Sequence, residues 1–315
     1  MTDTAVIDVE HLGKHFGEVE AVRALSFEVP AGSVVGLLGP NGAGKTTTVN
    51  MLTTLLPIDT GSAAIGGHDV SDEPDAVRRL IGLAGQSAAV DEKLTGAENL
   101  QLFCRLYRMP KAQRVARVAE LIDRFYMSEF ANRPVSTYSG GQRRRLDVVA
   151  ALVASPPALF LDEPTTGLDP RSRSEMWEVI EDLRDGGTAI LLTTQYLEEA
   201  DRLANTIIML DQGAVVARGT PRELKRDLGR DVLEVHVVTP DDLTLAVSVI
   251  GDRPDLAVDQ DERRIRIPVA GGAEGPLEVL RRLDQANVGV VDFQLRRPTL
   301  DDVFLAVTGN REDAR

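Results

Sequence analysis

Eight consecutive residues form a loop suited to binding phosphate. Gly39-Pro40-Asn41-Gly42-Ala43-Gly44-Lys45-Thr46 fits the pattern G-x-x-x-x-G-K-[ST] and follows an apolar run, Val34 to Leu38. The glycines let backbone N–H groups converge on phosphate oxygens, and the following helix, which continues with Thr47, points its positive end at them. We expect Lys45 to reach the β and γ phosphates and the Thr46 hydroxyl to bind Mg²⁺. The alternative is a chance glycine-rich turn, which the strand before the loop and its Lys-Thr ending disfavour.

Two adjacent carboxylates follow a second apolar run. Asp162 and Glu163 come directly after Ala158 to Leu161, at the point where a buried strand would end. In an open α/β sheet, ligands bind beyond the carboxyl ends of the strands, and a buried acid is costly unless it holds a metal or a reacting water. We expect Asp162 to bind Mg²⁺ and Glu163 to be the base that orients and deprotonates the attacking water. Taken alone such a pair more often marks the edge of a loop, but the phosphate loop upstream favours the metal site.

A serine and two glycines open a further helix in Ser139-Gly140-Gly141-Gln142. A hydroxyl and exposed backbone N–H groups at a helix N-terminus can form a second anion site, although these four residues taken alone favour a plain helix N-cap. The next residues, Arg143 to Arg145, are expected to contact a neighbouring phosphate or a partner domain rather than nucleic acid. One bound ATP does not obviously need two phosphate sites.

The elements that must position these residues follow the rhythm of a parallel α/β sheet. Short apolar runs alternate with longer amphipathic segments, and Val34–Leu38, Ala158–Leu161 and Ala189–Thr193 are typical of strands buried on both faces. A helical subdomain is predicted over residues 95–153. Its first helix begins at Thr95, which has a glutamate three positions on, the spacing of a capping box.

From about residue 231 the pattern changes to a small α+β domain. The predicted order is strand 232–238, helix 241–250, strands 256–258 and 264–269, helix 276–286, strand 290–295 and helix 299–307. This order suggests a ferredoxin-like domain, with the two domains spanning residues 1–228 and 229–315.

Composition excludes several classes of protein. The 315 residues carry 49 acidic and 35 basic side chains, a net charge of -14, which disfavours broad binding to nucleic acid or to anionic lipid. No run approaches the roughly 20 apolar residues needed to cross a bilayer, and no signal-peptide pattern is present. The single cysteine, Cys104, has apolar neighbours and is expected to be a core thiol. If the chain works at a membrane, another protein must hold it there.

The chain resembles the nucleotide-binding domain of ABC transporters, a P-loop NTPase fold, over roughly residues 6 to 222. The resemblance lies in three motifs in this order: the phosphate loop, Tyr138-Ser139-Gly140-Gly141-Gln142 and the Asp162-Glu163 pair. The resemblance implies ATP and Mg²⁺ as cofactors and a homodimer paired head to tail. In such a dimer the Ser139 segment of one copy closes over the ATP bound by Lys45 of the other.

Further residues take roles from this resemblance alone. Phe16 matches the aromatic that stacks on adenine, although a lone Phe beside a strand is more often core. Gln86 matches the glutamine that touches Mg²⁺ or the attacking water. Asp169 matches the loop residue that contacts the opposite protomer. Gln195 stands where the family usually has a histidine; it can hydrogen-bond a phosphate but cannot relay a proton, so slower or differently regulated hydrolysis is expected.

Residues 193–200 and 296–305 resemble the daunorubicin-resistance subgroup of bacterial drug exporters. This implies an ATP-hydrolysing subunit that drives drug efflux through a separate membrane permease, at the cytoplasmic face of the membrane and without inserting into it. A C-terminal domain that only covers the sheet is as consistent with the sequence as one that supports assembly or regulation. A lipid or polysaccharide exporter would use the same machinery. A non-transport ATPase acting on the ribosome or DNA is the other alternative, disfavoured by the single set of motifs and the acidic charge.

Overall fold

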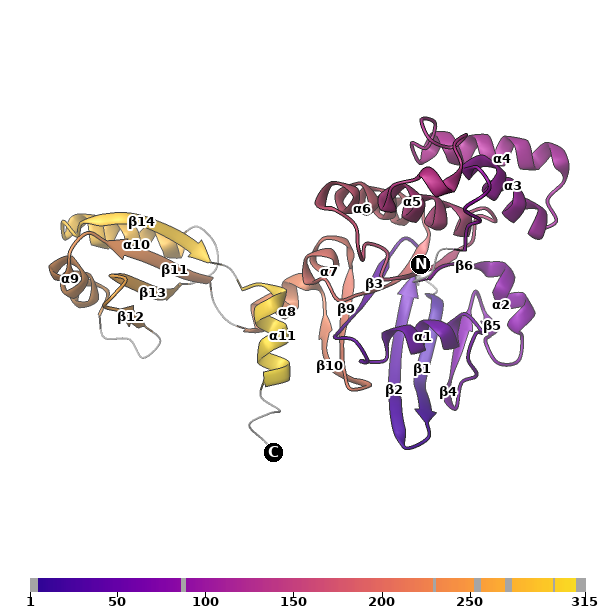
Figure 1. Cartoon of the computed structure of the whole chain (residues 1–315). Coiled ribbons are helices and arrows are strands. Elements are labelled where there is room, and N and C mark those ends of the chain that lie inside the picture. The colour runs from indigo at the N-terminus through magenta and orange to yellow at the C-terminus, as the bar shows by residue number, and fades with distance from the viewer. Residues whose placement is uncertain are drawn as a thin grey trace. The chain divides into compact units, whose positions relative to one another are not determined.

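The computed structural model describes residues 5–85, 89–228, 231–251, 256–269, 274–296 and 298–309 (Figure 1). Contacts divide the chain into two compact units, Met1–Pro221 and Arg222–Arg315. No helix of the described residues is long and apolar enough to span a bilayer.

A six-stranded sheet forms the centre of the first unit, in the order β10-β9-β3-β8-β7-β6. Its strands are β3 (Val34–Leu38), β6 (Ile81–Ala84), β7 (Ala158–Asp162), β8 (Ala189–Thr194), β9 (Thr206–Asp211) and β10 (Ala214–Gly219). All neighbours pair in parallel except β10, which runs antiparallel to β9 at the edge. The carboxyl ends of β3, β7 and β8 therefore meet at one edge of the sheet, where the motif residues follow them.

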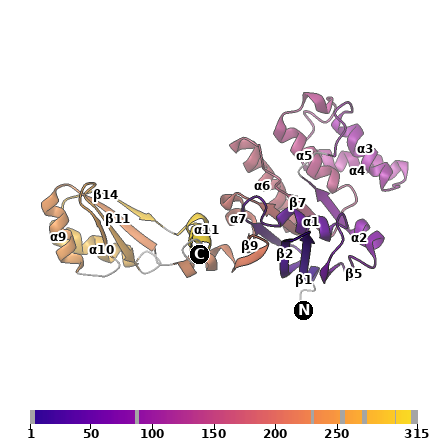
Figure 2. The ribbon, with the colours of Figure 1, turned by 60° about the horizontal axis from the view of Figure 1, so that its bottom comes forward.

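A second sheet, antiparallel, has the order β2-β1-β4-β5. Its strands are β1 (Ala5–Phe16), β2 (Val19–Pro30), β4 (Thr60–Ile65) and β5 (His68–Asp69). The helices of the unit are α1 (Lys45–Leu52), α2 (Pro74–Leu80), α3 (Gly96–Leu106), α4 (Lys111–Arg124), α5 (Gly140–Ala151), α6 (Pro170–Asp185) and α7 (Leu197–Leu203), with a 3₁₀ turn at Val135–Thr137. Helices α3, α4 and α5 group together, apart from the antiparallel sheet, in both Figure 1 and Figure 2.

Alternate residues of the central strands enter two different cores. On β7, Leu159 and Leu161 join the core formed with α3 to α6, whereas Ala158 and Phe160 join the core formed with the antiparallel sheet. All four are fully buried. Burial on both faces explains why these strands are continuous apolar runs rather than alternating ones. Truncating Phe160 to alanine would cost about 3–5 kcal/mol.

The second unit contains α8 (Pro221–Leu228) from its second residue on and a four-stranded antiparallel sheet in the order β12-β13-β11-β14. Its elements are β11 (Asp231–Val237), α9 (Pro240–Ile250), β12 (Ala257–Asp259), β13 (Arg264–Val269), α10 (Glu274–Gln285), β14 (Val290–Arg296) and α11 (Leu300–Gly309). Inward-facing residues of β11 and β13, among them Leu233, Val235 and Ile265, form one core with α9 and α10.

Several local predictions are confirmed. The strands expected at residues 34–38, 158–161 and 189–193 are present, and every predicted C-terminal element, from β11 to α11, lies within two residues of its expected bounds. Thr95 and Glu98 form the capping box that starts α3. Cys104 is fully buried, and burial raises the pKa of its thiol.

Candidate nucleotide site

The loop between β3 and α1 requires glycine at two positions. Gly44 caps α1 with a φ of 101°, and a Cβ there would lie 2.4 Å from the Ala21 carbonyl oxygen. A Cβ at Gly39 would lie 2.3 Å from the Leu210 carbonyl oxygen. These close approaches, together with the left-handed backbone at Gly44, explain why the loop needs glycines for packing as well as for exposing N–H groups.

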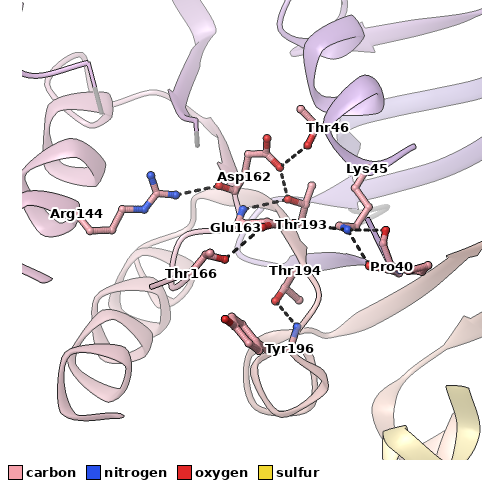
Figure 3. A network of polar contacts seen from close by, with 11 residues as sticks. Pro40, Lys45, Thr46, Arg144, Asp162, Glu163, Thr166, Thr193, Thr194 and Tyr196 are labelled. Atoms are coloured by element: carbon pink, nitrogen blue, oxygen red, sulfur yellow. Dashed lines mark hydrogen bonds and ion pairs between the residues drawn. The ribbon is translucent and has the colours of Figure 1, made fainter. Parts of the chain in front are cut away.

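Lys45 is held at the centre of the site (Figure 3). Its side chain is 4% exposed, and its Nζ donates hydrogen bonds to the carbonyl oxygens of Gly39 at 2.7 Å and Pro40 at 3.0 Å. Nζ also lies 3.6 Å from Oε1 of Glu163. Burial lowers the pKa of Lys45, and the carboxylates of Glu163 and Asp162 oppose that change. A buried ammonium at the end of a phosphate-binding loop is suited to binding an anionic phosphate.

Asp162, at the end of β7, accepts two hydroxyl hydrogen bonds. The Thr46 hydroxyl donates to Oδ1 at 3.2 Å, and the Thr193 hydroxyl on β8 donates to the same oxygen at 2.5 Å (Figure 3). Asp162 is 3% exposed. Carboxylate and hydroxyl oxygens are ligands that suit Mg²⁺, which commonly binds through one or two carboxylates together with substrate phosphates. The residues present at this position therefore fit the metal.

Glu163 has an unusual backbone conformation. Its φ is 51°, in the left-handed region. Its N–H donates to the carbonyl and to the hydroxyl oxygen of Thr193, each at 3.1 Å, and the Thr166 hydroxyl donates to its Oε2 at 3.2 Å. Non-glycine residues in this region cost about 1–3 kcal/mol and persist only where the surroundings hold them.

Ser139 and Asp169 form a second group. Ser139 caps α5 in a reciprocal capping box with Gln142, so the helix-cap interpretation describes its contacts. Asp169 caps α6, and hydrogen bonds from Ser172 and Arg171 lower the pKa of its carboxyl. A Cβ at Gly141 would lie 2.5 Å from the Ser172 hydroxyl, so the two helix starts are neighbours.

The remaining expected site residues differ in placement. Phe16 ends β1 and is 50% exposed, with the Lys14 ammonium 5.7 Å from its ring centre, so it is not a core residue. Gln195 is half-buried and follows Thr194 at the end of β8. Gln86 lies outside the described residues.

The three arginines after Gln142, for which the sequence predicts contact with a neighbouring phosphate or a partner domain, all contact groups of their own chain. Arg143 pairs with Glu92, and Arg145 with Glu175. Arg144 is 11% exposed and donates to backbone carbonyls of the site (Figure 3). Sequence reasoning missed this contact. It also missed the role of Thr193, whose polar side chain at the carboxyl end of a buried strand was the available signal.

Comparison with known proteins agrees with this geometry. A family model described as "ABC transporter" matches residues 22–166, and one described as "ATP-binding protein DrrA1-3-like, C-terminal domain" matches residues 219–308. The chain is 47% identical to the daunorubicin resistance ATP-binding protein DrrA2 of Streptomyces coeruleorubidus over 99% of its own length and 97% of that protein. The chain belongs to the ABC transporter ATP-binding proteins, in the daunorubicin-resistance subgroup. It is an ABC transporter ATPase.

The chain is also similar, over nearly its full length, to ATP-binding proteins whose names refer to different compounds. The chain is 46% identical to the daunorubicin/doxorubicin resistance protein DrrA of Streptomyces peucetius, over 99% of this chain and 95% of that one. It is also 36% identical to a Nod factor export ATP-binding protein of Ralstonia nicotianae, over 97% and 94%.

Among solved ABC structures, an ATP-binding subunit aligns over 70% of this chain and 92% of its own, with a TM-score of 0.63 and 28% identity. A dimeric ATP-binding cassette with ADP and Pi aligns over 68% and 98%, with a TM-score of 0.61 and 26% identity. ABC ATPases act with transmembrane subunits and form dimers.

Proposed function

We propose that this chain hydrolyses ATP at a site shared between two copies and so drives drug export through a separate permease. The observation that carries the proposal is the convergence of Lys45, Thr46, Asp162 and Glu163 at the carboxyl edge of the central sheet. A buried cation, a hydroxyl and two carboxylates are the groups that phosphoryl transfer to water requires.

Each residue takes a distinct role in this proposal. The loop from Gly39 to Thr47 binds the phosphates, with Lys45 at the terminal ones. Asp162, Thr46 and Gln86 hold Mg²⁺, which when bound neutralises charge on the phosphates. Glu163 orients the water and accepts its proton, and Gln195 donates a hydrogen bond to a phosphate oxygen. Phe16 stacks on the adenine, as its exposure allows.

The second group of residues acts across the dimer. Ser139-Gly140-Gly141-Gln142 of one copy closes over the nucleotide of the other, and Asp169 contacts the opposite protomer. The neighbouring starts of α5 and α6 support this proposal, because one rigid surface then presents both segments.

The transport role follows from the relatives. Nearly full-length similarity to daunorubicin-resistance proteins favours export of a drug or antibiotic, with the chain at the cytoplasmic face of the membrane and bound to its permease. Similarity to a Nod factor export protein keeps a cargo other than a drug open, and the lipid or polysaccharide cargo that the sequence allows is the second candidate. Expressing the chain with its permease and measuring daunorubicin accumulation separates these, since only a drug exporter lowers it.

The C-terminal domain is proposed to be ferredoxin-like and to begin after α8, at residue 229. Its element order β-α-β-β-α-β and the position of β11 between β13 and β14 support that fold.

The first test is Mg²⁺-dependent ATP hydrolysis at increasing concentrations of the purified chain, with Glu163→Gln as the control. A rate per chain that rises with concentration and disappears in the variant supports the shared site. A rate that is independent of concentration and unchanged in Glu163→Gln contradicts both the dimer and the role of Glu163.

A further inference from the structure

Arg144 contacts the backbone on both sides of Glu163. From the second turn of α5, its Nε donates to the Pro164 carbonyl at 2.9 Å and one terminal nitrogen donates to the Asp162 carbonyl at 2.9 Å. The other terminal nitrogen donates to the carbonyl of Gly85. One planar guanidinium therefore fixes three carbonyl oxygens from two loops. A fork of five N–H donors can do this, and a lysine ammonium cannot reproduce its geometry.

Asp147, one turn further along α5, completes the arrangement. It lies 3.3 Å from the Arg144 guanidinium and accepts a hydrogen bond from the Ala89 N–H at 2.9 Å. Asp147 is 4% exposed, and burial raises the pKa of its carboxyl. The arginine is thus held in place by its own helix and does not depend on solvent for a counter-charge.

The conformation of Glu163 explains what this clamp does. Its φ of 51° is a strained conformation. The Asp162 carbonyl belongs to the peptide plane that precedes Glu163, and the Pro164 carbonyl belongs to the plane that follows Pro164, whose ring fixes its own φ. Thr193 accepts a hydrogen bond from the Glu163 N–H, while Arg144 donates to the carbonyls of the preceding residue, Asp162, and the following residue, Pro164. The Glu163 carboxylate then points towards Lys45, 3.6 Å away (Figure 3).

We propose that Arg144 is a positioning residue for ATP hydrolysis: its two hydrogen bonds to the carbonyls flanking Glu163 hold the backbone conformation that aims the Glu163 carboxylate into the site. The inference rests on the proposed role of Glu163 as the base. It links the helix that begins at Ser139 directly to the hydrolytic carboxylate.

A matched control is available in the same unit. Arg117 on α4 donates to the carbonyls of Val153 at 3.1 Å and Leu152 at 2.7 Å, and pairs with Glu120 at 2.7 Å. Its side chain is 17% exposed. Arg117→Gln therefore removes a similar clamp on two backbone carbonyls without touching the site.

The test measures kcat, KM for ATP, affinity for a fluorescent ATP analogue and melting temperature of the full chain. We expect Arg144→Gln and Arg144→Lys to lower kcat about 10- to 100-fold, as a small misplacement of a reacting group does, with KM and affinity within about twofold of wild type. Arg117→Gln should lower the melting temperature comparably but keep kcat within about twofold.

Three outcomes overturn the inference: a kcat of Arg144→Gln within about twofold of wild type, restoration of kcat by lysine, or an equal loss of kcat in Arg117→Gln. If Arg144→Gln does not fold, Arg144→Lys carries the test. Glu163→Gln separates the two hypotheses. If Glu163→Gln hydrolyses ATP at the wild-type rate, Glu163 is not the base, and the proposed function fails together with this inference. If Glu163→Gln is inactive but Arg144→Gln is active, Glu163 remains the proposed base and only the positioning role of Arg144 is refuted.

Discussion

The Lys45 ammonium lies 3.6 Å from the Glu163 carboxylate, and the two side chains are only 4% and 10% exposed. Glu163 is the strongest of the charges that oppose the lowering of the Lys45 pKa by burial. Lys45, the proposed phosphate ligand, therefore forms an ion pair with Glu163, the proposed base. A bound triphosphate would compete with the Glu163 carboxylate for the Lys45 ammonium.

Substitutions of Glu163 and Lys45 should change the affinity for ATP in opposite directions. Glu163→Gln removes a negative charge beside the phosphates, so we expect ATP to bind roughly tenfold more tightly. Lys45→Met removes a charged hydrogen-bond donor worth about 1.5–3 kcal/mol, so affinity should fall. Equilibrium titration with a fluorescent ATP analogue, without Mg²⁺ to prevent turnover, measures both. A shift of both variants in the same direction would contradict the competition.

Thr193 should control the metal without being a proposed ligand. Its hydroxyl donates to Asp162 Oδ1, which orients the carboxylate proposed to bind Mg²⁺. Thr193→Val keeps the shape and removes the donor. We expect the Mg²⁺ concentration for half-maximal hydrolysis to rise about 10- to 100-fold, as for other groups that orient metal ligands. Thr193→Ser should restore the wild-type value, and a Thr193→Val variant with unchanged Mg²⁺ dependence would refute the role.

Phe16 should contribute to binding of the nucleobase and not of the phosphates. Stacking of a base on an aromatic side chain contributes roughly 1–3 kcal/mol. Phe16→Ala should weaken ATP binding by the corresponding factor, and Phe16→Tyr should keep it. Inorganic tripolyphosphate, which has no base, should bind Phe16→Ala and wild type equally in competition titrations. A loss of tripolyphosphate affinity would show that the substitution damages the phosphate loop instead.

The sequence predicted what depends on contiguous residues. The phosphate loop, the buried strands and the capping box at Thr95 are local patterns, and all were present in the structure. The contacts of Arg144 could not be predicted, because they join residues 18 and 20 positions apart, and another 59 apart, that only the sheet order brings together. Three adjacent arginines look alike in sequence, but a helix turns successive side chains by about 100°, so only the middle one enters the site.

Gln195 should make hydrolysis insensitive to protonation at this position. An amide can donate to a phosphate oxygen but does not titrate. We expect Gln195→Ala to lower kcat about tenfold by removing that donor. Gln195→His should introduce a step in kcat between pH 5 and 8, where histidine titrates, that wild type lacks. Rates of all three proteins across this pH range provide the measurement, and a kcat unaffected by Gln195→Ala would mean that the residue does not act on ATP.

Glu199 should make the stability of the first unit depend on pH. Its side chain is fully buried; Oε1 accepts from Thr165 and Trp177, while Oε2 has no hydrogen-bond partner within the described part of the chain. Burial raises its pKa, against the opposing effects of the nearby Thr194 hydroxyl, the hydrogen bonds of Thr165 and Trp177, and the charge of Arg173. The folded chain therefore keeps a proton that the unfolded chain releases above a pKa of about 4.3. Stability from this group is present below that pH and is lost as the pH rises through the folded pKa.

Glu199→Gln keeps the acceptor oxygen and removes the ionisation. Relative to wild type, we expect its melting temperature to be similar near pH 4 and to become higher as the pH rises to 8. Each kcal/mol of recovered stability should raise it by about 2–4 °C. Glu198→Gln is the matched control, because Glu198 is adjacent in sequence but its side chain is exposed. The difference in melting temperature between Glu198→Gln and wild type should not increase as the pH rises to 8. A Glu199→Gln curve parallel to wild type across the whole range would mean that Glu199 has the same pKa in the folded and unfolded chains.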